Sequence, residues 1–386
     1  MNTEHYNKIS IKEVLKMSVA DSSYYITDKG QVMCTGYNSQ GQLGLGDTVH
    51  RNTPALISNL TNVKQVACGD YHTLFLLNDG TVKACGENTS GKLGLGDTTN
   101  RTIPTLIPDL NNVNQVICGK DHSVFLLNNG AVKVCGNNGD GQLGLGDTTK
   151  RTSPTLIPDL TDIKQISCGL YYTVFLLNDG TIKSCGYNSN SQLGLGNTTN
   201  RNTPTMIPNL TNIKQISCGA QHTMFLLDNG TVKACGYNGL GQLGLGDTTN
   251  RTTPAIISSL SNIDLISCGD SHTMFLLKDG SVKACGYNYY GQLGLGDTTN
   301  RISPTLVSTN YNIIRLIDTP LLFKLLYTII SNGDEFTYDE YDTKNVFSNV
   351  EAVYKNAYTD LVSLLSDVDL HELLNYVIKK YKIISE

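Results

Sequence analysis

Tryptophan is absent from the 386-residue sequence, and charged residues are scarce, at 16% of the chain. The formal net charge is −5 at pH 7, so the chain lacks the basic excess that holds proteins on nucleic acid or on anionic membranes. It has no uninterrupted run of about 18 apolar residues, and we therefore expect no transmembrane helix and no membrane partner. Residues 1–6 contain no apolar signal core, which predicts an intracellular protein, cytoplasmic or nuclear, and not a secreted one.

The sequence also lacks the residue groupings that carry most enzyme chemistry. Its 11 cysteines include no Cys-x-x-Cys pair, which argues against a zinc site. It has no Gly-x-x-x-x-Gly-Lys-Ser/Thr loop for phosphates, and no catalytic triad or carboxylate pair stands apart from the repeat described below. We therefore expect no catalysis, no cofactor and no metal. Cysteines such as Cys68 and Cys85 recur at two fixed places in each repeat, which predicts small buried side chains between strands.

One motif is present six times. The stretch Gly-Gln-Leu-Gly-Leu-Gly-Asp returns every 50 residues without insertion or deletion, with small changes such as Lys92 in place of glutamine. Self-similarity at a fixed period of about 20–50 residues indicates a solenoid, a propeller or an array of small units. The copies begin at residues 41, 91, 141, 191, 241 and 291.

Each repeat contains four short strand signals, which we describe for residues 66–107. A continuous apolar run is typical of a strand buried on both faces, and an alternating run is typical of a half-exposed strand. Asn78-Asp79-Gly80 supplies the positive-φ residues that a tight hairpin turn needs. Pro104 cannot donate a ladder hydrogen bond, so the fourth strand should be the outer edge of its sheet. The predicted strands are 66–68, 73–77, 81–85 and 103–107.

Four short antiparallel strands in each of six repeats predict a β-propeller. Kelch and WD repeats have similar periods, but the chain has no tryptophan and no paired-glycine signature. The sixth copy shows a different set of short motifs, which recurs in register over residues 51–307: Ser267-Cys268-Gly269, His272-Thr273, Asp279-Gly280, Cys285-Gly286, Asn288 and the stretch 291–297. This set resembles the regulator of chromosome condensation repeat family, and the resemblance implies a propeller that usually has seven blades.

The number of blades depends on the two ends of the chain. Six clear repeats occupy residues 16–307, of which the first is degenerate. Residues 313–342 retain weaker strand signals. Residues 313–342, completed by an N-terminal strand over 6–12, would form a degenerate closing blade. The sequence thus predicts an all-β, seven-bladed propeller of four-stranded antiparallel blades over residues 1–342. A six-bladed ring with a C-terminal cap is the alternative.

The C-terminal residues 343–386 have a different pattern. Apolar residues recur at steps of three and four from Phe347 to Leu365 and again from Leu370 to Tyr381, as on one face of a helix. Ser366 or Asp367 can cap the second helix. We expect a short α-helical hairpin packed on the propeller, with a partner-binding helix as the alternative.

Two polar positions recur around the predicted ring. His72, His122, His222 and His272 share one place in the repeat, and we expect each to bond the backbone of its own blade rather than a metal, since equivalent atoms on neighbouring blades lie too far apart to share one ion. Arg101 and its equivalents should bond loop carbonyls or the nearby aspartate, with a basic band for an acidic partner as the alternative. The glycine-rich stretch lacks a following helix, so we reject a dinucleotide fingerprint.

The copies differ from one another mainly in two short windows. One lies between the first and second strands, at 70–71 and its equivalents, and the other follows the third strand, at 89–90 and its equivalents. In an antiparallel meander both windows emerge on one face, and the uniform Asn-Asp-Gly turns emerge on the opposite face. Drift without function is one interpretation of the varied face, and partner binding is the other. The candidate partner-binding residues are Asp70, Tyr71, Lys120, Asp121, Leu170, Tyr171, Tyr172, Gln221, Leu240, Asp270, Tyr289 and Tyr290.

These observations favour a non-catalytic protein-interaction scaffold or regulatory propeller with a protein partner. The family resemblance implies two alternatives. One is guanine nucleotide exchange on a Ran-like small GTPase, and the other is inhibition or regulation of another enzyme. The family's exchange factors use an inserted hairpin wedge, for which 50-residue repeats leave no room, and residues 1–12 hold only Lys8 and Lys12 in place of a basic tail. We therefore do not expect chromatin or nucleic-acid binding.

Overall fold

A computed structural model describes residues 11–15, 22–27 and 29–307, and for residues 11–15 it describes the backbone alone. The predicted closing blade at 313–342 and the predicted helical hairpin at 343–386 lie outside the described residues. No helix among the described residues has the length and apolar content needed to cross a membrane.

The described residues form six antiparallel sheets of four strands each, in sequence order within every sheet. The first three sheets contain β1 (Ile11–Leu15), β2 (Ser22–Thr27), β3 (Val32–Gly36), β4 (Arg51–Leu56), β5 (Val63–Cys68), β6 (His72–Leu77), β7 (Val82–Gly86), β8 (Arg101–Leu106), β9 (Val113–Cys118), β10 (His122–Leu127), β11 (Val132–Gly136) and β12 (Arg151–Leu156). The other three contain β13 (Ile163–Cys168), β14 (Tyr172–Leu177), β15 (Ile182–Gly186), β16 (Arg201–Met206), β17 (Ile213–Cys218), β18 (His222–Leu227), β19 (Val232–Gly236), β20 (Arg251–Ile256), β21 (Ile263–Cys268), β22 (His272–Leu277), β23 (Val282–Gly286) and β24 (Arg301–Leu306).

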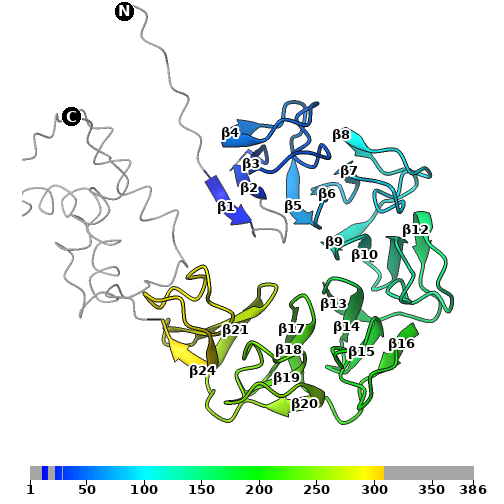
Figure 1. Cartoon of the computed structure of the whole chain (residues 1–386). Helices are drawn as coiled ribbons and strands as arrows, with labels where there is room; N and C mark the ends of the chain where they lie inside the picture. The colour runs from blue at the N-terminus through cyan, green and yellow to red at the C-terminus, as the bar shows by residue number, and fades with distance from the viewer. Residues whose placement is uncertain (1–10, 16–21, 28, 308–386) are drawn as a thin grey trace, which may run out of the picture. The chain divides into compact units, whose positions relative to one another are not determined.

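The six sheets follow one another around a common centre, with the first strand of each sheet innermost (Figure 1). Neighbouring inner strands are joined by glutamine side chains: Gln65 Nε2 donates to the Val116 carbonyl at 3.0 Å, and Gln65 Oε1 accepts from the Val116 amide at 3.1 Å. The side chains of Gln115, Gln165 and Gln215 make the same pair of bonds to the next inner strand. The fourth strands, including the one with Pro104, form the outer edges, as the sequence predicts.

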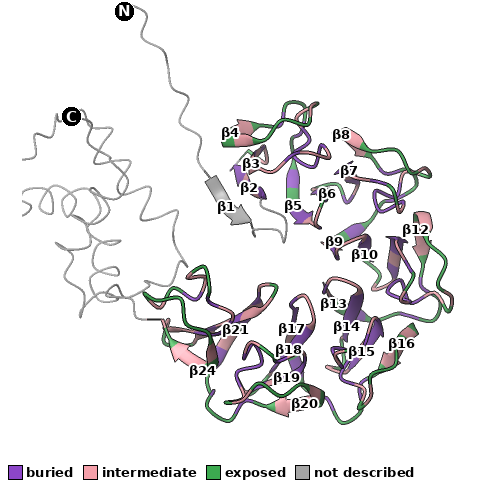
Figure 2. Cartoon of the chain, in the orientation of Figure 1, coloured by how far each residue is buried: buried purple, intermediate pink, exposed green. Residues whose placement is uncertain are grey.

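The core lies between the sheets rather than within any one of them. One face of the second sheet, with Leu74, Leu76 and Leu93 of the following loop, packs against a face of the third sheet that includes Val116 and Phe125. All five side chains are 0% exposed. The second strands of the second to fifth sheets are accordingly buried at every residue but the last (Figure 2). Each buried leucine contributes roughly 1.5–3 kcal/mol, so stacking of neighbouring sheets is the main source of stability.

The glycine-rich loop locks each sheet to the next. Gly46 N donates to the Thr102 carbonyl at 2.9 Å, across to the outer strand of the following sheet. Gly44 has φ +73°, and a Cβ there would lie 3.0 Å from Pro104 and 3.2 Å from the Cys85 sulfur. Glycine is required at this position both for its backbone conformation and for the close approach of Pro104.

The structure corrects the predicted role of the N-terminal strand. Residues 11–15 form β1, the inner strand of the first sheet, where Val14 pairs with Tyr25. The first four-stranded unit therefore begins at Ile11 rather than at residue 16. The prediction of a closing strand over 6–12 is wrong for Ile11 and Lys12, because both belong to β1. They lie about one repeat length before β5, the equivalent strand of the second sheet. Residues 6–10 lie outside the described residues.

Candidate interaction face

The two varied windows lie at the same end of the sheets. The Glu87 amide donates to the Tyr71 carbonyl at 2.8 Å, which joins the residues after the third strand to those before the second. The uniform turn at 78–80 is at the opposite end, where the Asn78 amide donates to the Asn62 carbonyl at 2.8 Å, in the segment that links two sheets. The prediction that the windows share one face is confirmed. We call the end formed by residues 70–71, 87–92 and their equivalents the varied face.

Eleven of the twelve candidate residues lie on this face with surface accessible to a partner. Tyr71, Tyr289 and Tyr290 are exposed by 38%, 65% and 80%, respectively. Asp270 is exposed as well. The others are partly exposed: Asp70, Lys120, Asp121, Leu170, Tyr171, Gln221 and Leu240.

Tyr172 is the exception, and its assignment as a partner-binding residue is wrong. Its side chain is fully buried, and its hydroxyl donates to the carbonyls of Gly219 and His222 in the next sheet. The reason is its register, because Tyr172 occupies the place that histidine fills in four other copies and belongs to the core rather than to the varied window.

The buried histidines also differ from the prediction. His122 Nε2 lies 3.0 Å from Thr173 Oγ1 in the next sheet, and that hydroxyl donates to the Gln142 carbonyl at 2.8 Å. His72 and His222 make the same link to Ser123 and Thr273. The expectation that each histidine bonds the backbone of its own blade is therefore wrong for His72, His122 and His222, because each ring bonds a hydroxyl of the neighbouring blade. Within the described residues, no group of His, Cys, Asp or Glu could hold a metal ion.

The ring of arginines is structural, as predicted. Arg101 Nη2 lies 2.6 Å from Asp97 Oδ2, and Arg101 Nη1 donates to the Thr99 carbonyl at 2.6 Å. Equivalent ion pairs occur in five of the six copies, and the fourth copy has Asn197 in place of aspartate. Each guanidinium is thus engaged by its own loop, which weakens the alternative of a basic band for an acidic partner.

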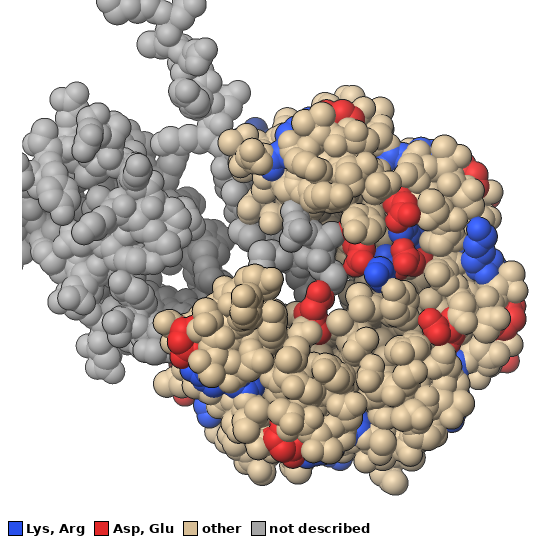
Figure 3. Space-filling model, in the orientation of Figure 1, with Lys and Arg blue, Asp and Glu red and all other residues tan. Residues whose placement is uncertain are grey.

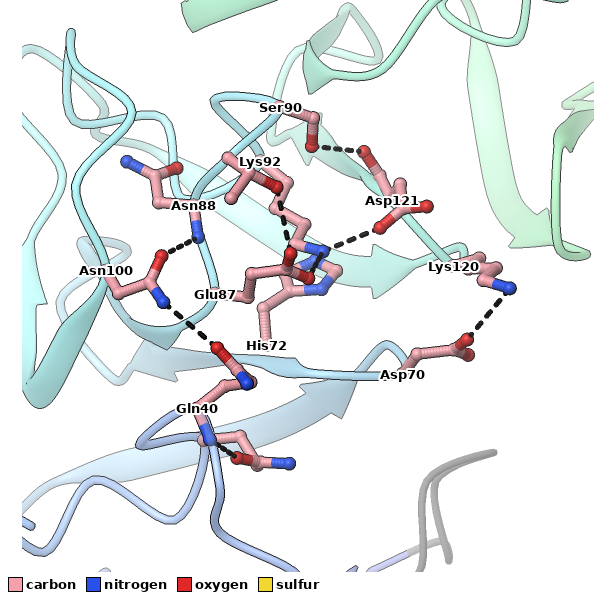
Figure 4. A network of polar contacts seen from close by, with 12 residues as sticks. Gln40, Asp70, His72, Glu87, Asn88, Ser90, Lys92, Asn100, Lys120 and Asp121 are labelled. Atoms are coloured by element: carbon pink, nitrogen blue, oxygen red, sulfur yellow. Dashed lines mark hydrogen bonds and ion pairs between the residues drawn. The ribbon is translucent and has the colours of Figure 1, made fainter. Parts of the chain in front are cut away.

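A buried charge cluster joins the second and third sheets on the varied face (Figure 4). The Lys92 side chain is 0% exposed, and its Nζ lies 2.6 Å from both Glu87 Oε2 and Asp121 Oδ1. In every other copy a glutamine takes the place of Lys92, and its side-chain oxygen accepts a backbone amide, as Gln42 accepts from Gln40. The cluster was not predicted from the sequence, although the position of Glu87 is acidic only in the copy that has the lysine.

Further charges lie beside this cluster, toward the centre of the ring (Figure 3). Lys120 Nζ lies 3.5 Å from Asp70 Oδ2 and 5.6 Å from the centroid of the Tyr171 ring. Burial raises the pKa of Asp70 above its usual range. Partial desolvation, with a smaller contribution from the Asp70 charge, raises the pKa of Asp270 to about 6. The centre of the varied face is therefore an environment that disfavours additional negative charge.

Tyrosines occur at several places on the varied face. Tyr37 and Tyr71 have ring centroids 6.1 Å apart, and Tyr171 and Tyr187 have centroids 6.4 Å apart. Tyr287, Tyr289 and Tyr290 form a three-ring cluster on one loop of the sixth sheet. Exposed aromatic side chains beside partly desolvated charges are typical of protein-binding surfaces.

Comparison with known proteins gives matches along most of the described chain. The profile of the regulator of chromosome condensation (RCC1) repeat matches residues 29–76, 79–126, 129–176, 179–226, 229–276 and 279–317. A second profile of the same repeat matches five shorter segments, from 63–92 to 263–292.

Individual relatives are similar over different lengths. Human protein RCC2 is 39% identical over 70 residues, which are 18% of this chain and 13% of RCC2, so this chain aligns with a small part of that relative. Human WBSCR16 has a similar structure, with a TM-score of 0.70 and 25% identity over 78% of this chain and 83% of the other. Prp20p from Saccharomyces cerevisiae, studied for its binding to Gsp1p and histones, has a TM-score of 0.67 and 22% identity over 75% of this chain and 76% of the other. The similarity to Prp20p shows a shared fold.

Proposed function

The chain belongs to the regulator of chromosome condensation (RCC1) repeat family, and on that premise we propose that it is a non-catalytic propeller that binds a protein partner through its varied face. One observation carries the proposal: the same repeat keeps uniform turns at one end and places different charged and aromatic side chains at the other. A partner that docks on the varied face would be selected by these differences. We place this activity inside the cell, as a scaffold or as a regulatory subunit.

Substitutions confined to the varied face should remove partner binding without unfolding the protein. We expect the variant with Tyr71→Ser, Lys120→Ala and Tyr171→Ser to lose about tenfold or more in affinity for a captured partner, since truncation of interface aromatic anchors costs at least about 1–2 kcal/mol. Affinity capture with mass spectrometry identifies the partner, and titration with the purified partner measures the loss. Asn128→Ser with Asn129→Asp changes exposed residues of the uniform turns and is the matched control. Equal losses for both variants would contradict the proposal.

Nucleotide exchange on a small GTPase is separated from simple binding by a nucleotide-release assay with a panel of GTPases. Acceleration of GDP release by the intact chain would replace the scaffold proposal with the exchange alternative. Binding of a partner without acceleration supports the scaffold or regulatory role. In the repeats that the structure describes, the constant 50-residue step leaves no inserted hairpin, which favours the second outcome.

We further propose that residues 313–342 complete a seventh blade against the sixth sheet. Met274, Leu276 and Val282 of the sixth sheet are partly exposed, whereas their equivalents Met224, Leu226 and Val232 are fully buried against the next sheet. The last match to the RCC1 repeat also runs on to residue 317, beyond the sixth sheet.

A closing blade should make the sixth sheet as sensitive to truncation as the fifth. We expect Leu276→Ala and its internal control Leu226→Ala to lower the free energy of unfolding by similar amounts, about 2–5 kcal/mol, because both would leave a cavity. Chemical denaturation measures both values. A loss below about 1 kcal/mol for Leu276→Ala alone would show that this face is uncovered and would contradict the seventh blade.

A further inference from the structure

The loop after β23 carries a group of tyrosines that no other described repeat has. Tyr287 occupies a position that is tyrosine in several copies, but Tyr289 and Tyr290 stand where the other copies have small or polar pairs and once Gly239-Leu240. Tyr289 and Tyr290 are 65% and 80% exposed, so they are not part of the core. This loop is the most aromatic part of the varied face.

The three rings have an ordered mutual arrangement. The Tyr287 and Tyr289 rings are within 12° of parallel, with centroids 6.3 Å apart. The Tyr290 ring is close to perpendicular to both, at 81° and 88°, with centroids 6.1 Å and 5.0 Å away. Ring faces are therefore presented along two directions, and the face is the part of an aromatic ring that attracts a cation.

Comparison with the fifth repeat explains why these rings stand together. There, a Cβ on Gly239 would lie 2.3 Å from the Tyr237 hydroxyl, so the ring of Tyr237 lies directly over the glycine. In the sixth repeat the side chain of Tyr289 occupies the space above the equivalent backbone position, so the Tyr287 ring cannot lie there. The Tyr287 ring instead stacks alongside the Tyr289 ring.

The backbone of the loop is fixed by contacts that do not involve these rings. Asn288 Oδ1 accepts the Leu293 amide at 2.9 Å, and the Tyr290 amide donates to Gln292 Oε1 at 3.0 Å. In the fifth repeat, Asn238 and Gln242 make the same two bonds at 2.9 Å and 3.0 Å. The tyrosine side chains can therefore be exchanged for those of the fifth repeat without loss of the loop structure.

The loop carries no net positive charge that would repel a cation. Residues 286–300 contain no lysine or arginine, and their one acid, Asp297, is paired with Arg301. The Tyr287 amide donates to the Ser271 carbonyl at 2.9 Å, which places the loop next to the segment that carries Asp270. The same chemistry already occurs inside this protein, where the Lys120 ammonium lies 5.6 Å from the Tyr171 ring centroid on the varied face.

We propose that Tyr287, Tyr289 and Tyr290 form an aromatic cage that binds one cationic side chain, a lysine, a methylated lysine or an arginine, of the partner polypeptide. This inference rests on the proposed function, because it assigns a chemistry to one part of the varied face. The π faces of the rings attract the cation.

The test uses the full chain and short peptides of glycine and serine that carry one lysine, trimethyl-lysine, arginine or acetyl-lysine. NMR titration that follows the peptide side-chain signals detects weak binding. We expect saturable binding of at least one cationic peptide and none of the uncharged acetyl-lysine peptide. The variant with Tyr289→Gly and Tyr290→Leu reproduces the fifth repeat, and we expect it to bind about tenfold more weakly or not at all. Tyr237→Asn, which installs the third repeat's residue in the fifth, removes a tyrosine outside the cage and should bind as the unmodified protein does.

The proposal is overturned if every cationic peptide behaves like the acetyl-lysine peptide, or if the Tyr289→Gly, Tyr290→Leu variant binds as tightly as the unmodified chain. Partner capture separates this result from the broader function. Loss of a captured partner by that variant, without any peptide binding, would reject the cage and leave the varied face as the interaction surface. Peptide binding to the cage, with no varied-face substitution affecting partner capture, would reject the proposed function and leave the cage.

Discussion

Lowering the pH from 7 to 5 should reduce the free energy of unfolding by about 5 kcal/mol, because buried histidines stay neutral in the folded chain. Burial lowers the pKa of His122 to about 4 and that of His222 to about 3. Burial, with smaller contributions from the charges of Lys92 and His122, lowers the pKa of His72 well below its usual range. In the unfolded chain each histidine titrates near its ordinary pKa of about 6.5.

The sign of the effect follows from where the protons bind. Between pH 6.5 and about 4 the histidines bind protons in the unfolded chain but stay neutral in the folded chain. The free energy of unfolding is therefore highest above about pH 6.5 and decreases as the pH falls. Each buried histidine then costs about 2 kcal/mol between pH 7 and 5, and three such residues together cost about 6 kcal/mol. Asp270, whose pKa is raised to about 6, acts in the opposite sense because its folded form binds the proton.

Denaturant unfolding at a series of pH values measures this dependence. The internal control is His122→Tyr, which installs the residue that the fourth repeat has at Tyr172. This variant should reduce the slope of stability against pH by about 1.4 kcal/mol per pH unit below pH 6. A slope that is unchanged by the substitution would show that His122 is not neutral in the folded chain.

Replacing Lys92 with glutamine should lower the free energy of unfolding by about 3 kcal/mol. The substitution leaves the Glu87 and Asp121 carboxylates facing each other across the seam between two sheets, where their side chains are only 22% and 25% exposed. Breaking a buried ion pair by removing one partner is strongly destabilising, whereas exchanging the whole group for a well-packed neutral set is often close to neutral. Urea denaturation measures the loss.

The control exchanges all three residues. Glu87→Tyr, Lys92→Gln and Asp121→Gln together reproduce the seam between the fourth and fifth sheets, which has Tyr187, Gln192 and Gln221. We expect this triple variant to regain stability to within about 1 kcal/mol of the unmodified chain. A triple variant as unstable as Lys92→Gln alone would assign the cost to packing of the lysine side chain rather than to unpaired charge.

The fold could be predicted in large part because its determinants are local and repeated. The Asn-Asp-Gly turn, the doubly buried run at 73–77 and Pro104 each act within a few residues, and the structure has the corresponding turn, strand and outer edge where they were expected. The inner strand β1 was misplaced because residues 11–15 carry only a weak strand signal. Its partner in the sheet, β2, lies in the degenerate first repeat, so the repeat pattern did not locate β1.

The polar contacts between sheets were harder to predict, since they join residues about one repeat apart. The bond from His122 to Thr173 spans 51 positions, and nothing near His122 in the sequence distinguishes a neighbouring hydroxyl from its own backbone. Tyr172 was assigned to the surface because it follows two varied residues, although its register places it in the core. Lys92 did carry a usable signal, because it departs from glutamine in one copy and is matched by acids at 87 and 121.

Hydrogen–deuterium exchange of the intact chain, with and without its captured partner, tests the central claim most directly. Binding through the varied face predicts slower exchange in the loops at 69–72, 86–92 and their equivalents, and unchanged exchange in the turns at 78–81 and theirs. Protection centred on those uniform turns, or no protection in any loop of the six sheets, would contradict the claim that this end of the propeller is where the partner binds.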